Sequence, residues 1–509
     1  MLAKVFSVSV LGIEPYLVEI EVDVSEGLPA VAVVGLPDAA IRESKERVKS
    51  AIKNSCYRYP PGRVTINLAP ADIKKEGPAF DLPIALGLLA ATQQINPNNL
   101  EGYIVLGELA LNGKIRPVKG VLSVALGMRM GQRKKLIIAK ENAAEAAVVK
   151  EIEVYPVENL VELVGFISGN IAIDKHKVDL DQILKNVSNC EVNFSDVKGQ
   201  LIARRALEIA ASGYHNVLMV GPPGTGKTML AKRFPTILPK LSLEEMLETT
   251  KIYSVAGLLK PNQALVTNRP FRAVHHTASD IALVGGGAIP RPGEVSLAHN
   301  GVLFLDELPE FHRDALEVLR QPIEDGYVIV SRVNRTINFF SRFLFCSTMN
   351  PCPCGYYDSP KVCHCTPAQI QRYRAKISGP LLDRIDIHIE VPALKYKELI
   401  SRQEAESSEQ IRERVNRVRQ TQLARFKDTG IYFNSQMNHK QIKRFCLITA
   451  KIKELLKEAV EELGISARAY HKILKVSRTI ADLDESEEIL PEHICEAVQY
   501  RCLDKNLWL

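Results

Sequence analysis

Tryptophan is almost absent from this chain of 509 residues, which contains a single one. Long hydrophobic runs are missing too, because no stretch approaches the roughly 18 uncharged apolar residues that a membrane-spanning helix needs. Residues 1–8 contain no apolar segment of the kind found in secretory signals. Internal repeats and low-complexity segments are also absent. We therefore expect a cytoplasmic protein that has no membrane partner.

The remaining composition is that of a globular protein, with 46% apolar and 24% charged residues. A chain of this length exceeds one ordinary hydrophobic core, so two or three domains are expected. The net charge of +6 is small for a chain of this size. It does not by itself require a nucleic-acid partner, and such a function has to be argued from local motifs.

A glycine-rich loop at residues 221–228 reads Gly-Pro-Pro-Gly-Thr-Gly-Lys-Thr. The apolar run 217–220 precedes it, and the helix-like segment 229–233 follows. A strand that turns through glycines into a helix directs backbone N–H groups and a helix dipole at one position, where Lys227 adds a cation and Thr228 a hydroxyl for Mg²⁺. This pattern predicts a loop that binds ATP. The expected cofactor-binding residues are Gly221, Pro222, Pro223, Gly224, Thr225, Gly226, Lys227 and Thr228.

Two acidic residues, Asp306 and Glu307, end the apolar run that begins at Gly301. In a nucleotide-binding sheet this placement suits Asp306 as a Mg²⁺ ligand through water and Glu307 as the carboxylate that polarises the attacking water. The alternative is an ordinary core strand with an exposed acidic end, which the upstream loop makes the weaker interpretation. Together the two motifs predict an ATPase that uses Mg²⁺.

Three further polar residues are candidates for the same chemistry. Asn350 follows the apolar run 343–347, and a polar residue at that strand end is expected to orient the attacking water, although it is more often a simple turn residue. Arg384 and Arg468 stand near predicted helix ends. Such arginines are normally surface ion pairs. In an oligomeric ATPase, however, Arg384 could reach the γ-phosphate of the neighbouring subunit, and Arg468 could report the nucleotide state to a lid.

Four regions follow from changes in pattern along the chain. Residues 1–168 alternate strand-like and helix-like runs, which predicts an α/β domain. Residues 169–192 are polar and aperiodic, and are expected to form a linker. Residues 193–393 contain the nucleotide motifs. Residues 394–509 are rich in Glu, Lys, Arg and Leu at helical spacing, which predicts a small helical domain.

Four of the ten cysteines fall in one short window, as Cys352, Cys354, Cys363 and Cys365, with His364 among them. The spacing C-x-C is a less specific signal than C-x-x-C. Four thiolates in one loop nevertheless suit tetrahedral Zn²⁺ in a closed structural site, and no position is left open for a catalytic metal. Redox-active thiols are the alternative.

Two segments are additions to a minimal ATPase. Residues 327–340 are expected to form a β-hairpin whose tip carries Arg332 and Arg335, and the simplest interpretation is a solvated surface hairpin. Residues 283–292 contain three glycines and two prolines. That composition suits a loop that moves or that contacts the backbone of a ligand.

The motifs together resemble the ComM/YifB family of Mg-chelatase-like AAA+ proteins. The resemblance covers essentially the whole chain and rests on residues 221–228, His275-His276-Thr277 through Gly285-Gly286-Gly287, residues 291–307 and Asn350-Pro351-Cys352-Pro353-Cys354-Gly355. It implies a homo-hexameric ring ATPase and, as in competence-associated members, a DNA helicase that drives branch migration during natural transformation.

The resemblance also implies a role for each candidate residue. Lys227 and Thr228 would be the phosphate and Mg²⁺ ligands, Asp306 and Glu307 the Walker B pair, Asn350 sensor 1, Arg384 the finger acting in trans and Arg468 sensor 2. Segments corresponding to the two additions project into the pore of the ring in this family. Arg332 and Arg335 are therefore the expected contacts to DNA phosphates.

Residues 1–168 resemble the peptidase domain of Lon, which has an S5 domain 2-like fold. Gly77-Pro78-Ala79 stands where Lon-like proteases have Gly-Pro-Ser, and Leu122 stands where they have the catalytic lysine. Neither a methyl nor an isobutyl group can attack a carbonyl. We therefore expect a proteolytically inactive domain.

The expected fold is α/β, with a Lon-protease-like domain, an AAA+ core built on a parallel sheet and a C-terminal helical lid. The expected function is an ATP-driven hexameric motor on single-stranded or branched DNA. Two alternatives stay open, a Mg-chelatase-type motor subunit for metal insertion into tetrapyrroles and a protein-remodelling ATPase related to Lon. The basic hairpin and the chain's own N-terminal domain disfavour the first, and Ala79 and Leu122 disfavour the second.

Overall fold

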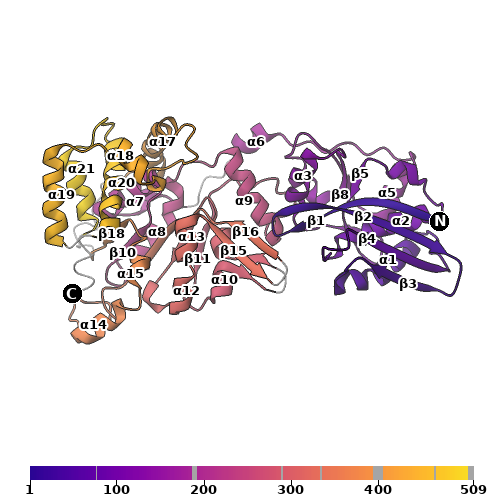
Figure 1. Cartoon of the computed structure of the whole chain (residues 1–509), viewed down its shortest axis with the longest axis horizontal. Coiled ribbons are helices and arrows are strands. Elements are labelled where there is room, and N and C mark those ends of the chain that lie inside the picture. Colours follow the sequence, from indigo (N-terminus) through magenta and orange to yellow (C-terminus); the bar gives the residue numbers. More distant parts are fainter. Residues whose placement is uncertain are drawn as a thin grey trace. The chain divides into compact units, whose positions relative to one another are not determined.

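The computed structural model describes residues 1–75, 77–185, 192–287, 290–332, 335–393, 405–463 and 466–501. The chain forms two compact units, whose elements are labelled in Figure 1. The first consists of Met1–Val187 and Leu243–Thr267, and the second of Ser188–Ser242 and Asn268–Leu509. Each unit is organised around its own hydrophobic core.

A seven-stranded mixed sheet, in the order β3-β4-β2-β1-β5-β8-β9, forms the centre of the first unit. Strands β1 and β2 are an antiparallel hairpin, and β4 pairs antiparallel with β2. Alternate residues of β2 are buried, as expected for a strand with one packed face. The strands are β1 Leu2–Leu11, β2 Glu14–Ser25, β3 Ala30–Val34, β4 Arg63–Ala69, β5 Tyr103–Val105, β8 Lys135–Ala139 and β9 Glu153–Val157, with a separate ribbon of β6 Glu108–Leu109 and β7 Ile115–Arg116.

The helices of this unit begin at recognisable local signals. Helix α1 starts after Asp38, whose carboxylate accepts a hydrogen bond of 2.8 Å from Ile41 N, a cap worth about 1 kcal/mol. Helix α2 is buried along its whole length and packs on β1 and β2. The helices are α1 Ala39–Asn54, α2 Asp81–Ala91, α3 Val121–Met130, α4 Ala143–Ala146, α5 Leu160–Ile167 and α6 Leu180–Lys185. Helix α6 falls in the segment expected to be a linker, of which residues 186–191 lie outside the described part of the chain.

Helix α9, Leu243–Ala256, belongs to the first unit although in the sequence it lies between β10 and β11, two strands of the second unit's sheet. It packs against α3, where Gly120 N donates a hydrogen bond of 3.1 Å to Ser254 O. The buried carboxylate of Glu145 accepts hydrogen bonds from Ser254 Oγ and, at 2.8 Å, from Leu122 N. The domain limits expected from the sequence place this segment in the ATPase core. A local sequence pattern cannot show that α9 packs against residues of the first unit.

A five-stranded parallel sheet, in the order β11-β14-β17-β10-β18, forms the centre of the second unit. Every residue of β10, β14 and β17 is buried, which explains why the sequence shows continuous apolar runs and not alternation. The strands are β10 Val217–Val220, β11 Phe271–Val274, β14 Val302–Leu305, β17 Leu344–Met349 and β18 Ile387–Glu390. The loops after β10, β14 and β17 therefore meet at the carboxyl edge of the sheet.

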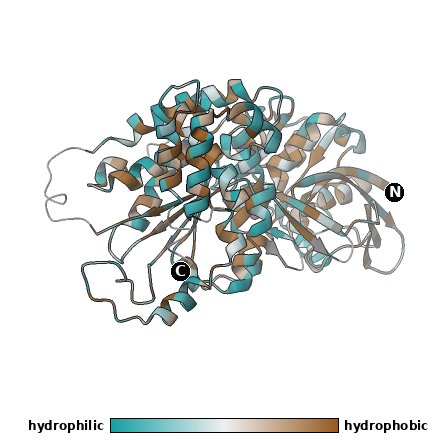
Figure 2. Ribbon diagram, turned by 60° about the vertical axis from the view of Figure 1, so that its left-hand side comes forward, coloured by the Kyte–Doolittle hydropathy of each residue, from teal (hydrophilic) through white to brown (hydrophobic). Residues whose placement is uncertain are grey.

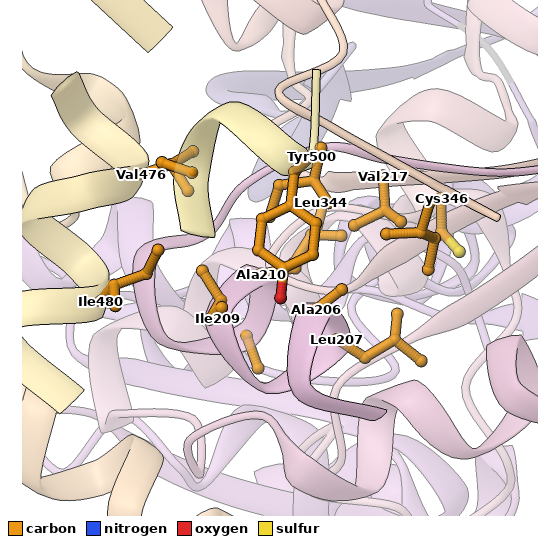
Figure 3. Packing of buried hydrophobic residues seen from close by; sticks show 14 of the residues in the cluster. Ala206, Leu207, Ile209, Ala210, Val217, Leu344, Cys346, Val476, Ile480 and Tyr500 are labelled. Atoms are coloured by element: carbon orange, nitrogen blue, oxygen red, sulfur yellow. The ribbon is translucent and has the colours of Figure 1, made fainter. Parts of the chain in front are cut away.

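The core of this sheet is continuous with that of the C-terminal helices. Figure 3 shows side chains of helix α7, Leu201–Gly213, beside residues of β10 and β17 and of the last helices. The labelled members are Ala206, Leu207, Ile209, Ala210, Val217, Leu344, Cys346, Val476, Ile480 and Tyr500. The helical domain is thus joined to the sheet by shared packing as well as by the chain.

Helices α17 to α21 lie together in Figure 1 and complete the second unit. Capping boxes start two of them, Ser407 with Gln410 at α17 and Asn438 with Gln441 at α18. In Figure 2 the helices alternate between hydrophobic and hydrophilic residues, as amphipathic helices with one buried face do. Their bounds are α17 Ser408–Arg425, α18 His439–Phe445, α19 Ala450–Leu463, α20 Ala467–Leu483 and α21 Pro491–Gln499. The expected α/β class, with a parallel sheet and a helical C-terminal domain, is confirmed.

Shorter elements surround the sheet. The helices are α8 Lys227–Ile237, α10 Asp280–Val284, α11 Glu294–Leu297, α12 Arg313–Glu317, α13 Arg320–Asp325, α14 Pro367–Arg374 and α15 Gly379–Leu382, and a small ribbon joins β12 Gly285–Gly286 to β13 Arg291–Pro292. In the described ranges, no helix is long and apolar enough to cross a membrane.

The expected hairpin is present as β15, Tyr327–Arg332, and β16, Arg335–Phe340. The two strands pair antiparallel from Tyr327 with Phe340 to Arg332 with Arg335, so both arginines stand at the tip. Val328 and Phe339 lie opposite each other and are buried, which fixes the base of the hairpin. The side chains of Arg332 and Arg335 lie outside the described part of the structure, and their contact with DNA stays a prediction.

Candidate functional site

Lys227 lies folded against its own loop. Its Nζ donates hydrogen bonds to Gly221 O at 2.6 Å, to Pro222 O at 2.9 Å and to Asn350 Oδ1 at 3.2 Å. Burial lowers the pKa of Lys227, and the nearby carboxylates of Asp306 and Glu307 oppose that change. These hydrogen bonds all end on neutral oxygens, so the ammonium can take an anionic phosphate as a partner without first breaking an ion pair.

The backbone of the loop explains why glycine is required in it. Gly224 and Gly226 have φ angles of 80° and 91°, a region that side chains with a Cβ rarely adopt. A Cβ on Gly221 would lie 2.2 Å from Val391 O, which leaves no room for any other residue there. The loop is therefore held in a shape that only glycine allows at these positions, as expected for a loop whose backbone approaches a phosphate closely.

Gln200 is a part of this site that the sequence did not reveal. Its Nε2 donates hydrogen bonds to Thr225 O at 3.2 Å and to Pro392 O at 2.8 Å, which ties the loop to the end of β18. Gln200 also has a left-handed φ of 52° and precedes helix α7. The only local signal is the pair Gly199-Gln200 before a helix, which is not specific enough to assign a role.

The acidic strand end meets the loop. Thr228 Oγ1 donates a hydrogen bond of 2.9 Å to Asp306 Oδ2, and Thr348 Oγ1 donates one to Asp306 Oδ1. Glu307 N donates to Thr348 Oγ1 at 3.2 Å, and Glu307 itself has a left-handed φ of 54°. The hydroxyl of Thr228 beside the carboxylate of Asp306 offers the hard oxygen ligands that Mg²⁺ prefers. The donor set therefore fits the expected metal, and Thr348 is a second residue that the sequence did not single out.

Asn350, placed by the same sheet, reaches the expected position. It follows β17, which lies between β14 and β10 in the sheet, and its Oδ1 accepts from Lys227. The structure thus brings Lys227, Thr228, Asp306 and Asn350 into one network, with Glu307 next to it in the chain.

Arg384 and Arg468 lie elsewhere, at the amino edge of the sheet. Asn216, the residue before β10, donates from its Nδ2 to Arg384 O at 3.0 Å. Lys227 follows the opposite end of β10. The four residues of that strand, at roughly 3.3 Å each, put a greater distance between Arg384 and Lys227 than an arginine side chain can span. Both arginines line one cavity of about 510 Å³, together with Lys472 and Lys475. Neither can contact a phosphate held by its own loop.

The guanidinium of Arg384 is only partly engaged. Its Nη1 donates to Pro380 O at 2.8 Å and its Nη2 pairs with Glu324, whose side chain is 56% exposed. Its Nε is buried and has no hydrogen-bond partner among the described residues. A solvent-exposed carboxylate is a weakly held partner, so another anion can replace it at low cost.

The four cysteines of the predicted zinc site lie together. The Sγ atom of Cys352 is 3.3 Å from that of Cys354 and 3.7 Å from that of Cys363, and all four ligand atoms lie within 4.8 Å of one another. Cys365 Sγ accepts from Cys354 N at 3.4 Å, and backbone N–H groups of Tyr356 and His364 lower the pKa of Cys354 to about 6. This set fits tetrahedral Zn²⁺.

The cysteine loop also lies against the phosphate loop, because a Cβ on Gly355 would approach Pro223 Cδ to 2.7 Å. His364 is not part of the metal-ligand group in the described chain. A metal at the cysteines would therefore stiffen the loop that supports Pro223 without touching nucleotide.

We expect the purified protein to contain about one Zn²⁺ per chain, and Cys363→Ser to lose it. Chelation should lower the melting temperature, because a metal that binds only the folded state stabilises that state. Elemental analysis and thermal denaturation measure both effects, and Cys495→Ser, at an exposed cysteine outside the group, is the matched control. Metal-free protein after reducing purification would remove the zinc site and favour redox-active thiols.

Ala79 and Leu122, the residues expected at the nucleophile and base positions of Lon, have apolar side chains. Leu122 is fully buried in an apolar cluster, and Ala79 packs against that cluster, as does Leu247 of α9. The carboxylate of Glu145 nearby is bound by Leu122 N and Ser254 Oγ. Among the described residues, helix α9 packs against the same apolar cluster that contains Leu122.

Comparisons with known proteins match almost the whole chain. The family model for magnesium chelatase, subunit ChlI, matches residues 193–399, and models for subunit ChlI and for its C-terminal part match residues 20–142 and 405–501. Competence protein ComM from Haemophilus influenzae is 45% identical, with 99% of this chain and 98% of that protein covered. The uncharacterized protein YifB from Escherichia coli is 43% identical over the same shares. An archaeal Lon protease from Halobacterium salinarum is 36% identical over 19% of this chain and 14% of its own length.

Proposed function

Because the chain belongs to the ComM/YifB family of Mg-chelatase-like AAA+ proteins, we propose that it is an ATP-hydrolysing ring motor that acts on DNA. The observation that carries the hydrolysis is the network in which Thr228 and Thr348 both bind Asp306 while Lys227 binds Asn350. A phosphate cradle and a metal-binding carboxylate converge there from three separate strands, which a purely structural loop does not need.

Each residue of the network has a step to perform. Lys227 and the backbone N–H groups of residues 224–228 bind the β- and γ-phosphates, and Thr228 and Asp306 would hold Mg²⁺. The metal, when bound, neutralises charge that develops on the phosphate oxygens. Glu307 polarises the attacking water, and Asn350 orients it.

Arg384 and Arg468 act on the nucleotide of a neighbouring subunit in this proposal. Their position at the amino edge of the sheet, in one cavity, keeps them away from the chain's own loop. A site that needs them is complete only in an oligomer, and we propose a homo-hexamer on the basis of the family. Arg468, as sensor 2, then acts on the nucleotide of the neighbouring subunit together with Arg384. It does not link the nucleotide of its own subunit to the helical lid.

We propose that the chain binds single-stranded or branched DNA. ATP hydrolysis then drives branch migration of that DNA in transformation or recombination. This proposal is supported by full-length similarity to a competence protein and by a rigid hairpin that ends in Arg332 and Arg335. A cytoplasmic location and a structural Zn²⁺ are part of the same proposal.

The double variant Arg332→Ala/Arg335→Ala tests the DNA part. We expect weaker DNA binding, a salt dependence reduced by about 1.4 in its logarithmic slope for single strands, and unwinding uncoupled from hydrolysis. Binding is measured by anisotropy at several salt concentrations, and unwinding on a fork. Lys440→Ala/Lys443→Ala removes two exposed charges of helix α18 and is the matched control. Normal fork unwinding by the arginine variant would place the DNA contact elsewhere, first at Gly285-Gly286-Gly287.

A chelatase-type motor is the second candidate, because the matching family models are those of the magnesium chelatase subunit ChlI. The two functions differ in what stimulates the ATPase. Turnover measured side by side with single-stranded DNA, forked DNA and protoporphyrin separates them, and stimulation by protoporphyrin alone would reverse our preference.

A further inference from the structure

Asp386 is a buried carboxylate that joins three elements around the cavity of Arg384 and Arg468. Its Oδ1 accepts a hydrogen bond of 2.8 Å from Lys472 Nζ of α20. Its Oδ2 accepts from Asn216 N at 3.2 Å and lies 3.4 Å from His215 Nδ1, both just before β10. The side chains of Asp386 and Lys472 are only 10% and 15% exposed.

The pair is ionised in spite of its burial. Burial opposes the charge on Asp386, but Lys472 and His215 outweigh it and hold the pKa of the carboxyl well below its usual range. Burial lowers the pKa of Lys472 to about 8, although Asp386 counteracts it. Loss of one partner would leave an uncompensated charge in the interior, which is strongly unfavourable. The contact therefore holds its two elements together firmly.

Both partners stand next to an arginine of the cavity. Asp386 follows Arg384 by two residues, and Lys472 follows Arg468 by four, which puts the latter two on one face of α20. Asn216 binds both sides of the turn, since its N donates to Asp386 and its Nδ2 to Arg384 O. The ion pair thus links the segments that carry the two arginines, beside a hydrogen bond of 2.8 Å between His215 Nε2 and Thr479 Oγ1 of α20.

The same contact reaches the chain's own nucleotide site. Asn216 leads directly into β10, and β10 leads into the phosphate loop. The strand pairs with β17 along one edge and with β18 along the other, and all of its residues are buried. A displacement of the phosphate loop that is transmitted through β10 would move Asp386, and through Asp386 it would move Arg384 and Arg468.

We propose that Asp386 is a positioning residue that, through Lys472, holds Arg384 and Arg468 at one spacing for the nucleotide of the adjacent subunit and, through Asn216, links that spacing to the subunit's own phosphate loop. This inference rests on the proposed hydrolysis in trans. It assigns a role to a cluster that lies too far from the phosphate loop of the same subunit to contact a phosphate there. It also provides a physical route that couples the nucleotide sites of neighbouring subunits.

The test is the rate of ATP hydrolysis in mixed rings. Asp386→Asn keeps the shape of the side chain and removes its charge, and we expect its own rings to hydrolyse roughly ten- to a hundredfold more slowly, as misplaced catalytic groups do. Mixed with Lys227→Ala subunits, which keep intact arginines, it should recover part of the activity. Mixed with Arg384→Ala subunits it should not, because neither partner then supplies a correctly placed pair.

A purely structural role predicts a different pattern, in which Asp386→Asn fails in both mixtures because its own nucleotide site is damaged. The double variant Asp386→Asn/Lys472→Gln guards against misfolding, since it removes both members of the buried ion pair, and it should behave as the single variant does. Lys472→Arg should retain activity. The control is Lys457→Gln, which removes an exposed lysine of α19, 74% exposed, and should match wild type.

Full activity of Asp386→Asn rings, or loss in both mixtures, would overturn the inference. Failure of the underlying proposal looks different, because rings of Arg384→Ala alone would then hydrolyse normally.

Discussion

Replacing Lys227 by alanine should abolish ATP binding, whereas Glu307→Gln should bind ATP and stall. Lys227 Nζ lies within 2.9 Å of the loop carbonyls of Gly221 and Pro222, where its charge meets the phosphates. Glu307 follows β14 and is not part of the loop, so its replacement keeps the cradle intact. Loss of the carboxylate that acts on the water should cost on the order of 10²–10⁴ in rate. Nucleotide titration and phosphate release measure the two effects separately.

A matched control exists three residues further along. Glu310 pairs with Lys376 and its side chain is 42% exposed, so Glu310→Gln should turn over as wild type does. Sustained turnover in Glu307→Gln would show that the catalytic carboxylate comes from another strand.

The variant Arg384→Ala should hydrolyse poorly alone and regain part of its activity when it is mixed with Lys227→Ala subunits. At a mixed interface the intact loop of one subunit faces the intact arginine of the other. An arginine that stabilises the transition state of phosphoryl transfer contributes about 10³–10⁵ in rate, so even partial recovery is easily measured. The measurement is the steady-state ATPase rate against mixing ratio, with ring formation checked by sedimentation.

Arg372 on helix α14 is exposed, and Arg372→Ala should hydrolyse normally without mixing. If Arg384→Ala showed no recovery at any ratio although mixed rings form, its ion pair with Glu324 would be its whole role.

The clustering of Lys227, Thr228, Asp306 and Asn350 could be predicted because each residue belongs to a short segment with a recognisable pattern. A loop that must adopt positive φ at Gly224 and Gly226 needs glycine there, and buried parallel strands need uninterrupted apolar runs. Once the strand ends are known, the geometry of a parallel sheet brings Asp306 and Asn350 to the same edge. The fold class and these positions therefore followed from local patterns.

The rest depends on packing between distant segments, which local patterns do not record. Arg384 and Arg468 are far apart in the sequence, and only the tertiary fold puts them in one cavity. Gln200 and Thr348 act through hydrogen bonds to residues that no spacing rule connects to them. The roles of these residues are decided by the whole fold, and a single sequence carries no signal for them.

The excursion of residues 243–267 has a consequence for how the molecule can be divided. The chain passes between the two units at three places, near residues 187, 242 and 267, and not at a single hinge. A truncation that begins at residue 188 would keep α9 but remove α3, which would expose the apolar face around Leu247 and leave Ser254 without Glu145. The first unit is therefore built from two separate segments of the chain, and neither unit can be excised by one cut. Any shortened form of the first unit has to bring residues 243–267 back by a new connection.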